Sequence, residues 1–287
     1  MALLPEREDR TDPRIGWPDG HFYSPVPSAG DIKRALESAD HVEREILGIP
    51  IDQEAMVKLG SKLSDAFGNF MMEPRPIERH LYGYEQSTEF NLSDAITLTA
   101  FLASLVPRRV IEIGSGFSTA VMLDARAAFS LEFHLTSVDP NPERLWGILG
   151  RHKPACLSIL EEQVQDVALE TFNTLQPNDL LFIDSSHVCK AGSDVLYEFF
   201  EIIPRLSAGV IIHIHDIFHN FEYPSEWLNE GRYWSEAYLL RALLTNNSRL
   251  EILFWQNGME PTKFDELNDA FPQLMRQVGS SMYLRTT

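Results

Sequence analysis

Two polar segments, each directly after an apolar run, hold the residue types best suited to chemistry. The first is Asp184-Ser-Ser-His187, and the second ends in His215-Asp216. If both runs are neighbouring strands of a parallel sheet, the carboxylates of Asp184 and Asp216 lie close together, which is unfavourable unless a proton or a cation separates them. Carboxylate oxygens with open water positions favour Mg²⁺, and an imidazole from His215 also admits Mn²⁺ or Fe²⁺. The segments therefore predict a divalent-metal site at Asp184, His215 and Asp216.

His187 is the candidate general base beside this site, and Asp184 is the second candidate catalytic residue. An imidazole titrates near neutrality, so His187 can accept a proton from a hydroxyl group whose pKa a bound cation has lowered. Two other interpretations stay open: Asp184 caps the helix that follows, or His187 is a structural histidine. His213 lies inside the second apolar run, so we expect it to pack in the core rather than to bind a ligand.

The elements that must position these residues follow from the pattern of apolar runs. From residue 110 onward, short apolar runs alternate with helical segments. The runs lie at 110–113, 135–138, 157–160, 180–183, 210–214, 252–254 and 282–284. Such alternation is typical of an α/β fold with a mostly parallel sheet covered on both faces. Ligands of these sheets bind beyond the carboxyl ends of the strands, where Gly114, Asp139, Asp184 and Asp216 all fall.

The first strand-to-helix turn contains Gly114-Ser-Gly116, with Glu112 inside the preceding strand. Glycines at these positions permit a tight turn and let a ligand approach the backbone. The dinucleotide-binding pattern G-x-G-x-x-G needs a third glycine at a position where this chain has Thr119. Asp139 ends the second strand, where a carboxylate can accept hydrogen bonds from both hydroxyls of a ribose. The turn and Asp139 together suit the adenosine of either a nicotinamide or a methionine cofactor.

The Glu-x-Gly-x-Gly pattern resembles motif I of the class I S-adenosylmethionine-dependent methyltransferases, with Ser118 where that family usually has a third glycine. The resemblance implies a Rossmann-like seven-stranded sheet, mostly parallel with an antiparallel last strand. It also implies S-adenosylmethionine as the cofactor, with Asp139 at the ribose and with Gln165 and Asp166 near the adenine; a helix cap is the alternative for Asp166. The implied cofactor-binding residues are Glu112, Gly114, Ser115, Gly116, Ser118, Asp139, Gln165 and Asp166.

The chain also resembles one branch of that family, the metal-dependent O-methyltransferases that act on sugars of macrolide antibiotics. In that branch, acids matching Asp184 and Asp216 hold Mg²⁺, and a histidine matching His187 is the general base. His215 stands where the branch has a glutamate. The resemblance implies methylation of a hydroxyl on a small molecule or glycan. The segment 219–236 mixes aromatic residues with carboxylates and is expected to close over a polar ring, such as a sugar or a phenol.

The N-terminal part has a different character. Residues 1–30 contain five prolines and three glycines, which predicts an extended arm. Apolar residues at helical spacing predict three helices, the first with Asp31 as its N-cap and the third amphipathic, at about 31–47, 56–70 and 92–105. We divide the chain into an arm and helical cap at 1–90 and a cofactor-binding domain at 91–287. The first part is either a cap over the site or a surface for a homo-oligomer.

The composition excludes several classes of partner. The net charge is −18 and no run of Lys and Arg occurs, so nucleic acid and anionic membrane surfaces are poor partners. We find no apolar run of about 18 residues and no signal-peptide pattern, and therefore expect a cytoplasmic protein. Cys156 and Cys189 lack the spacing of a metal knuckle or a redox pair and are interpreted as reduced thiols.

Three other functions are compatible with parts of this pattern. A nicotinamide-dependent oxidoreductase is disfavoured by Thr119 and by the absence of a Tyr-x-x-x-Lys pair from the sequence. A non-catalytic cofactor-binding protein would keep the glycine turn without needing His187. A metal-dependent hydroxylase or hydrolase would use the same acids but not S-adenosylmethionine.

Overall fold

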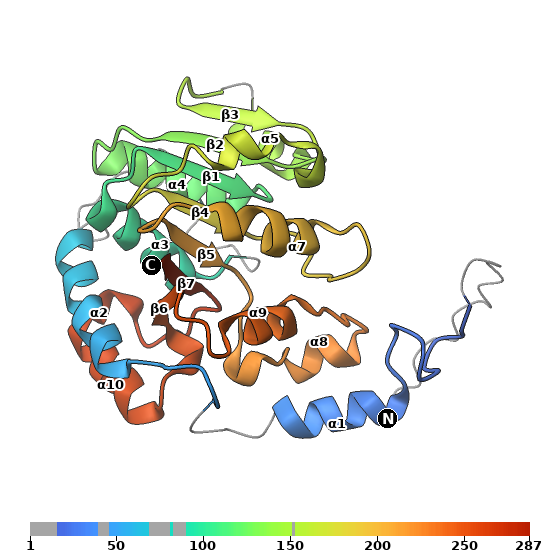
Figure 1. Cartoon of the computed structure of the whole chain (residues 1–287). Helices are drawn as coiled ribbons and strands as arrows, with labels where there is room; N and C mark the ends of the chain where they lie inside the picture. Colours follow the sequence, from blue (N-terminus) through green and yellow to red (C-terminus); the bar gives the residue numbers. More distant parts are fainter. Residues whose placement is uncertain (1–15, 40–45, 69–80, 83–89, 151–152) are drawn as a thin grey trace.

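The computed structural model describes residues 16–39, 46–68, 81–82, 90–150 and 153–287, and one seven-stranded sheet runs through it (Figure 1). In chain order the strands are β1 (Arg109–Ile113), β2 (His134–Val138), β3 (Leu157–Leu160), β4 (Leu180–Ile183), β5 (Ile211–Ile214), β6 (Leu250–Trp255) and β7 (Met282–Thr286). Each predicted apolar run is a strand, extended or trimmed by at most two residues at either end. The predicted Rossmann-like class is confirmed.

The spatial order of the strands is β3-β2-β1-β4-β5-β7-β6. The pairs from β3 to β5 are all parallel, whereas β7 runs antiparallel to both β5 and β6. β4 and β5 are buried along their whole length, which explains why they are continuous apolar runs rather than alternating ones. The chain order reverses between β1 and β4, so a crevice for ligands is expected at their carboxyl ends.

Helices pack around this sheet and follow most of its parallel strands (Figure 1). They are α1 (Ala29–Ala39), α2 (Gln53–Phe67), α3 (Leu92–Leu105), α4 (Phe117–Ala128), α5 (Glu143–Leu149), α6 (Leu169–Phe172), α7 (Asp194–Tyr197), α8 (Ser225–Asn229), α9 (Glu236–Leu244) and α10 (Pro261–Ala270). Among the described residues, no helix is long and apolar enough to cross a membrane.

Two sequence predictions about helices need correction. α3 has the predicted bounds but is not amphipathic: every residue from Ser93 to Leu102 is buried, because α2, α4 and the short turn η7 (Pro272–Leu274) pack against it. Asp31 is not the N-cap of α1. Ser28 holds that place, since its hydroxyl accepts from the Asp31 N–H while the Asp31 carboxylate accepts from the Ser28 N–H, a reciprocal capping box.

α2 belongs to the same core as the sheet. It packs against α3, α10 and β6, and its Met56, Leu63 and Phe67 side chains are fully buried. The proposed division of the chain at residue 90 stays a prediction. His213 in β5 is fully buried and stacks on Phe182, with ring centroids 3.9 Å apart, so its predicted place in the core is confirmed.

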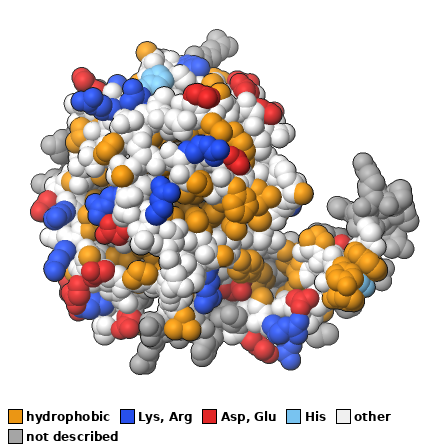
Figure 2. Space-filling view, in the orientation of Figure 1, with side chains coloured by type: hydrophobic (Ala, Val, Ile, Leu, Met, Phe, Trp, Pro, Cys, Tyr) orange, Lys and Arg blue, Asp and Glu red, His pale blue; other side chains and the backbone are white. Residues whose placement is uncertain are grey.

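The start of the described chain lies at the rim of the molecule. α1 contacts α8, and the segment before it projects outward (Figures 1 and 2). Trp17, Phe22 and Tyr23 are exposed there and stack on the ring of His21 or on one another. This aromatic group is consistent with the extended arm expected from the prolines, and its partner stays a prediction.

Candidate functional site

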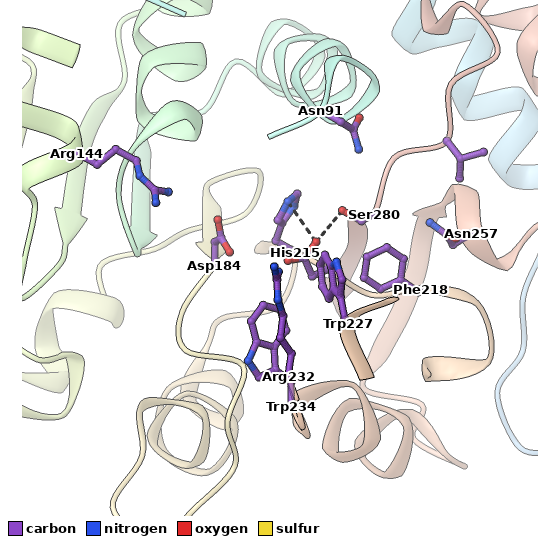
Figure 3. A pocket seen from close by; sticks show the side chains of 12 residues that line it. Asn91, Arg144, Asp184, His215, Phe218, Trp227, Arg232, Trp234, Asn257 and Ser280 are labelled. Carbon is purple, nitrogen blue, oxygen red and sulfur yellow. Dashed lines mark hydrogen bonds and ion pairs between the residues drawn. The ribbon is translucent and has the colours of Figure 1, made fainter. Parts of the chain in front are cut away.

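Two neighbouring cavities open at the carboxyl ends of the parallel strands. The first, of about 650 Å³, borders the β1–α4 turn and the end of β2. The second, of about 790 Å³, lies beyond β5 (Figure 3). Asp184 and Arg144 line both cavities, so the wall between them is formed by the end of β4 and by α5. We call them the turn cavity and the aromatic cavity.

The glycine turn shapes the first cavity. Gly114 has a positive φ of 84°, and a Cβ at this position would lie only 1.9 Å from the carbonyl oxygen of Asp184. Ser115 donates from its backbone N–H and its hydroxyl to Oδ2 of Asp139, over 3.1 and 2.6 Å. The N–H of Asn141 donates to the other oxygen of Asp139 over 2.8 Å. Ser115 and Asp139 both face the turn cavity, as predicted residues of one binding site should.

Glu112 lies beneath this turn and not in the cavity. It is fully buried and accepts hydrogen bonds from the hydroxyls of Ser118, Thr119 and Ser137, at 2.7, 2.7 and 2.5 Å. Burial raises the pKa of Glu112 to about 7, against the effect of these hydrogen bonds. Glu112 and Ser118 therefore do not line the cavity. They hydrogen-bond to each other beneath the turn and support it.

The other predicted cofactor residues are divided between wall and surface. Gln165 lines the turn cavity and donates to the carbonyl oxygen of Gly192 over 2.9 Å. Asp166, its neighbour, is exposed and lies outside the cavity lining. Gly116 is the N-cap of α4, and a Cβ there would lie 3.0 Å from the side chain of Arg144. Arg144, which the sequence analysis did not single out, thus covers the glycine turn.

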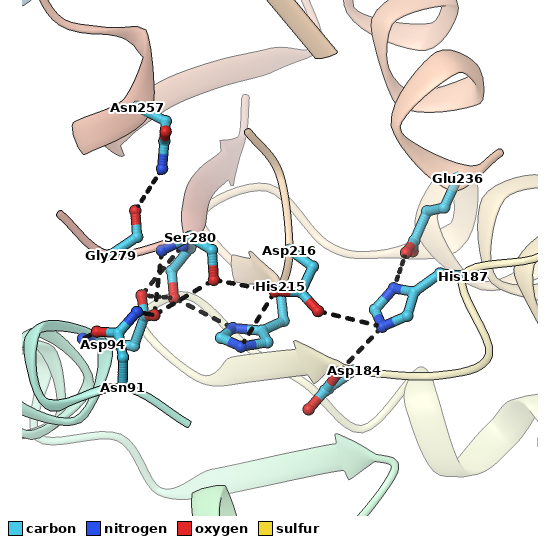
Figure 4. Close-up of polar contacts among 11 residues, drawn as sticks. Asn91, Asp94, Asp184, His187, His215, Asp216, Glu236, Asn257, Gly279 and Ser280 are labelled. Atoms are coloured by element: carbon cyan, nitrogen blue, oxygen red, sulfur yellow. Dashed lines mark hydrogen bonds and ion pairs between the residues drawn. The ribbon is translucent and has the colours of Figure 1, made fainter. Parts of the chain in front are cut away.

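Three side chains meet at the end of β4 and β5. Oxygen or nitrogen atoms of Asp184, His187 and Asp216 lie within 4.8 Å of one another, a spacing that can hold a metal ion. The Nε2 atom of His187 lies 3.4 Å from Oδ1 of Asp184 and 3.7 Å from Oδ2 of Asp216 (Figure 4). The predicted convergence of these residues is therefore present.

The backbone at two of these residues is unusual. His187 and Asp216 have φ values of 58° and 57°, in the left-handed region that residues with a Cβ rarely adopt. Such conformations persist only where the surrounding structure holds them, and they concentrate at functional sites. Two such residues, His187 and Asp216, belong to the same three-residue cluster.

His215 lies beside Asp216, but it is not in the group with metal-ligand spacing. It is buried, its Nε2 lies 3.6 Å from Oδ1 of Asp216, and its ring lies 5.0 Å from that of Phe90. It lines the aromatic cavity, but the group with metal-ligand spacing contains His187 in its place. The left-handed turn at residue 187 brings that imidazole between the two aspartates.

Charges at the cluster act on one another. Burial opposes ionisation of Asp184, but the imidazoles of His215 and His187 lower the pKa of that carboxyl to about 2. Burial disfavours the protonated form of His187 as well, yet its hydrogen-bonding carboxylates raise the pKa of this imidazole well above its usual value. Burial raises the pKa of Asp216, partly offset by both histidines. Three carboxylates, those of Asp184, Asp216 and Glu236, thus lie close to the one imidazole of His187.

The third of these carboxylates is Glu236, a residue to which the sequence analysis assigned no role of its own. It is fully buried at the start of α9, and its Oε2 atom lies 2.7 Å from Nδ1 of His187 (Figure 4). The N–H groups of Ser235 and Glu236 also donate to the carbonyl oxygen of His187, over 2.9 and 3.1 Å. The start of α9 therefore grips both the ring and the backbone of His187.

Asp216 is held from the opposite side. The hydroxyl of Ser280 donates to its Oδ1 atom over 3.0 Å, and the N–H of Ser280 donates to the buried carboxylate of Asp94 in α3 over 3.0 Å. Ser281 donates to the same carboxylate. This chain of contacts ties the segment before β7 to the cluster (Figure 4).

Aromatic residues of the segment after β5 form the wall of the second cavity. Phe218, Trp227 and Trp234 line it, as predicted for a loop that covers a ring (Figure 3). Tyr223 does not; it is buried, and its hydroxyl accepts a hydrogen bond from the N–H of Ala237. Tyr82 is buried as well and donates to the carbonyl oxygen of Phe90.

Comparison with known proteins identifies the family. Residues 111–217 match a family model described as a methyltransferase domain. An uncharacterized protein of Archaeoglobus fulgidus is 31% identical over 188 residues, which cover 62% of this chain and 82% of that protein. The matched segment runs from β1 through the glycine turn and the end of β4 to the residue after Asp216.

Solved structures with a similar shape are more distant. The S-adenosylhomocysteine-bound methyltransferase PaMTH1 of Podospora anserina is 15% identical, with a TM-score of 0.42 over 85% of this chain and 99% of that one. The plantazolicin methyltransferase BpumL, in complex with S-adenosylhomocysteine, is 14% identical, with a TM-score of 0.40 over 82% and 99%. The strand order of the chain itself, rather than these distant likenesses, defines the fold.

Proposed function

Because this chain belongs to the class I S-adenosylmethionine-dependent methyltransferases, we propose that it methylates a hydroxyl of a small molecule or sugar with the help of a divalent cation. The observation that carries the proposal is the cluster of Asp184, His187 and Asp216, which lies where the two cavities meet. A methyltransferase must bind its methyl donor and its acceptor in adjacent sites, so that the methyl group can pass directly from one to the other. The two neighbouring cavities, with this cluster between them, meet that requirement.

The turn cavity suits the cofactor. Its Gly114 turn lets a ligand approach the backbone closely, and Asp139 offers a carboxylate for ribose hydroxyls. S-adenosylmethionine supplies a methyl group on a positively charged sulfur, which makes that carbon electrophilic. The protein then has to align an oxygen with this carbon and to remove its proton.

The two aspartates suit a divalent cation. Asp184 and Asp216 offer hard oxygens on adjacent strand ends, and Asp184 faces both cavities. A cation held there would lower the pKa of an acceptor hydroxyl and fix its direction. A cation bound to these carboxylates would also weaken their attraction for the protonated imidazole, and His187 would then be able to act in its neutral form.

His187 is the proposed general base, and Glu236 is the residue that orients it. When Nδ1–H donates to Glu236, the lone pair of Nε2 points toward the aspartates and can accept the hydroxyl proton. Trp234 packs on the imidazole, with ring centroids 4.5 Å apart, and shields it from solvent. The arrangement follows the logic of a base held in one tautomer by a buried carboxylate.

The decisive experiment separates cofactor, metal and chemistry. Calorimetry measures S-adenosylhomocysteine binding, and a turnover assay follows methylation of the diol 3,4-dihydroxybenzoate with Mg²⁺ or with EDTA. We expect turnover to fall about 100-fold with EDTA and in Asp184→Asn and Asp216→Asn, while affinity for S-adenosylhomocysteine changes less than about threefold. Asp269→Asn, at an exposed carboxylate of α10, is the matched control.

Two results would contradict the proposal. Turnover that is unaffected by EDTA and by both aspartate variants removes the metal from the mechanism. Tight binding of NAD or NADP without detectable binding of S-adenosylhomocysteine in the millimolar range favours an oxidoreductase and removes the methyl transfer altogether.

A further inference from the structure

The wall of the aromatic cavity carries two arginines beside its two aspartates. Arg144 and Arg232 line the cavity together with Asp184 and Asp216 (Figure 3). A divalent cation between the aspartates, as in the proposed function on which this inference rests, would offset their negative charge and so weaken the repulsion that they exert on an anionic ligand. The guanidinium of Arg232 can then attract an anion locally, although the whole chain has a net charge of −18.

Arg232 is held in place by stacking. Its guanidinium carbon lies 5.0 Å from the ring centroid of Trp227 and 5.8 Å from that of Trp234. Cation–π contacts of this kind orient a guanidinium while leaving its edge able to donate hydrogen bonds. Trp234 also contacts the imidazole of His187, so one indole touches both the guanidinium and the proposed base.

Among the described residues Arg232 forms one ion pair, and this pair leaves the guanidinium able to bind another anion. Its NH2 atom lies 2.9 Å from Oε2 of Glu230, and both side chains are about half exposed. Exposed pairs of this kind are weak because water screens them, so a ligand carboxylate can share or replace Glu230. A planar guanidinium binds a carboxylate through two parallel hydrogen bonds, which a neutral group cannot match.

We propose that the acceptor is a hydroxylated ring acid: a vicinal diol placed at Asp184 and Asp216, with a carboxylate bound by Arg232 across the width of one ring. The ring lies against Trp227, whose indole forms the apolar wall of the cavity. This chemistry is shared by phenolic acids and sugar acids. Arg232 is accordingly a specificity-determining residue of the acceptor site.

Two matched pairs of probes test the charge requirement. They are 3,4-dihydroxybenzoate with its amide, and glucuronate with its amide; each pair differs in charge and hardly in shape. Binding to the protein loaded with S-adenosylhomocysteine and Mg²⁺ is measured by calorimetry and by quenching of tryptophan fluorescence. We expect the acid of at least one pair to bind about tenfold more tightly than its amide, and the pair that does so identifies the kind of ring.

The variants then assign this preference to one residue. In Arg232→Met the preference for the acid should fall below about threefold, whereas Arg205→Met should keep it. Arg205 is a good control because it is equally exposed, is paired with Glu201, and lines neither cavity. Since the measured quantity is a ratio of two affinities in the same protein, partial loss of folding does not imitate the result.

Three outcomes overturn the inference: amides that bind as tightly as their acids, an acid preference that survives in Arg232→Met, and no binding of either acid. The proposed function fails in a different way. If the acid preference depends on Arg232 but no hydroxyl is methylated, the anionic ligand stands and the transfer reaction does not. If neutral diols are methylated without any acid preference, the reaction stands and the anionic acceptor does not.

Discussion

The turn cavity and the aromatic cavity share a wall but are built from the chain in different ways. The turn cavity is lined by residues at the ends of β1, β2 and β4 and in the segments that follow the first four strands. The aromatic cavity combines Asn91 before α3, Trp227 and Trp234 after β5, and Ser280 before β7. The first cavity is therefore a product of the fold, and the second depends on segments added to it.

Because of this difference, we expect the strand ends to determine the chemistry and the loop segments to determine the selectivity. Strand ends of a parallel sheet converge whatever the loops contain, so a site built on them persists when the loops change. Loop segments are positioned only by their own contacts, such as the hydrogen bond between Glu236 and His187. Variants on the two sides of the wall should accordingly fail in different ways.

The largest effect is expected on the aromatic side. His187→Ala removes the proposed base and should reduce kcat about 1000-fold, while affinity for S-adenosylhomocysteine changes less than about twofold. Steady-state kinetics and calorimetry measure the two quantities. His134→Ala, at an exposed histidine of β2, is the control. A loss of cofactor affinity equal to the loss of turnover would mean that the two cavities do not act separately.

Gly114→Ala should instead disrupt the turn cavity. The new Cβ would lie 1.9 Å from the Asp184 carbonyl oxygen at a positive φ, so we expect a loss of about 3 kcal/mol in unfolding free energy and weaker binding of S-adenosylhomocysteine. Gly147→Ala in α5 meets nothing within 4 Å and should be neutral or stabilising by about 0.5–1 kcal/mol. Urea unfolding distinguishes the two. Equal stability of both variants would show that the turn tolerates a side chain.

Glu112→Gln tests the buried carboxylate that supports the turn from beneath. Glu112 is protonated in the folded state up to a pKa of about 7 but ionises near 4.5 when unfolded, so its burial makes the wild type lose stability as the pH rises from 5 to 7. The neutral amide avoids this loss. Between pH 5 and pH 8, the stability of the variant relative to the wild type should rise by about 2–3 kcal/mol in urea unfolding. A difference that does not change with pH would contradict a protonated Glu112.

The smallest effect is expected for Glu236→Gln. The amide can still hydrogen-bond to Nδ1 of His187 but no longer favours a single tautomer, so kcat should fall about tenfold with KM nearly unchanged. Glu236→Asp, which keeps the charge, should recover part of kcat. If both variants lower only the melting temperature and not kcat, Glu236 supports the fold and does not orient the base.

The sequence was informative where local patterns decide the structure. Short apolar runs located all seven strands, and for β4 and β5 the reason is that parallel strands buried along their whole length need no alternation. The same reasoning placed Asp184 and Asp216 together, since adjacent strands end at the same edge. α3 shows the limit: its residues repeat at helical spacing, but whether its second face is covered depends on α2 and η7, which are distant in sequence.

The supporting residues were beyond local reasoning. Glu236 hydrogen-bonds to His187, which lies 49 positions earlier in the chain. Asp94 accepts a hydrogen bond from Ser280, 186 positions after Asp94, and Ser280 in turn contacts Asp216. One signal was available: Glu236 is the last residue of the segment 219–236, which was already expected to cover the site. Residues that bind from far along the chain carry no spacing by which the sequence could reveal them.

The attachment of α9 to His187 has a practical consequence for enzyme engineering. The stretch from Phe218 to Trp234 is continuous, provides the cavity's three aromatic side chains, and ends where Ser235 and Glu236 are anchored. We expect its cavity-lining positions to be exchangeable between homologous scaffolds, provided that the graft keeps the buried Phe221, Tyr223 and Leu228 and ends before Ser235. New acceptors would then be reached by changes within seventeen consecutive residues while the donor half of the protein is left untouched.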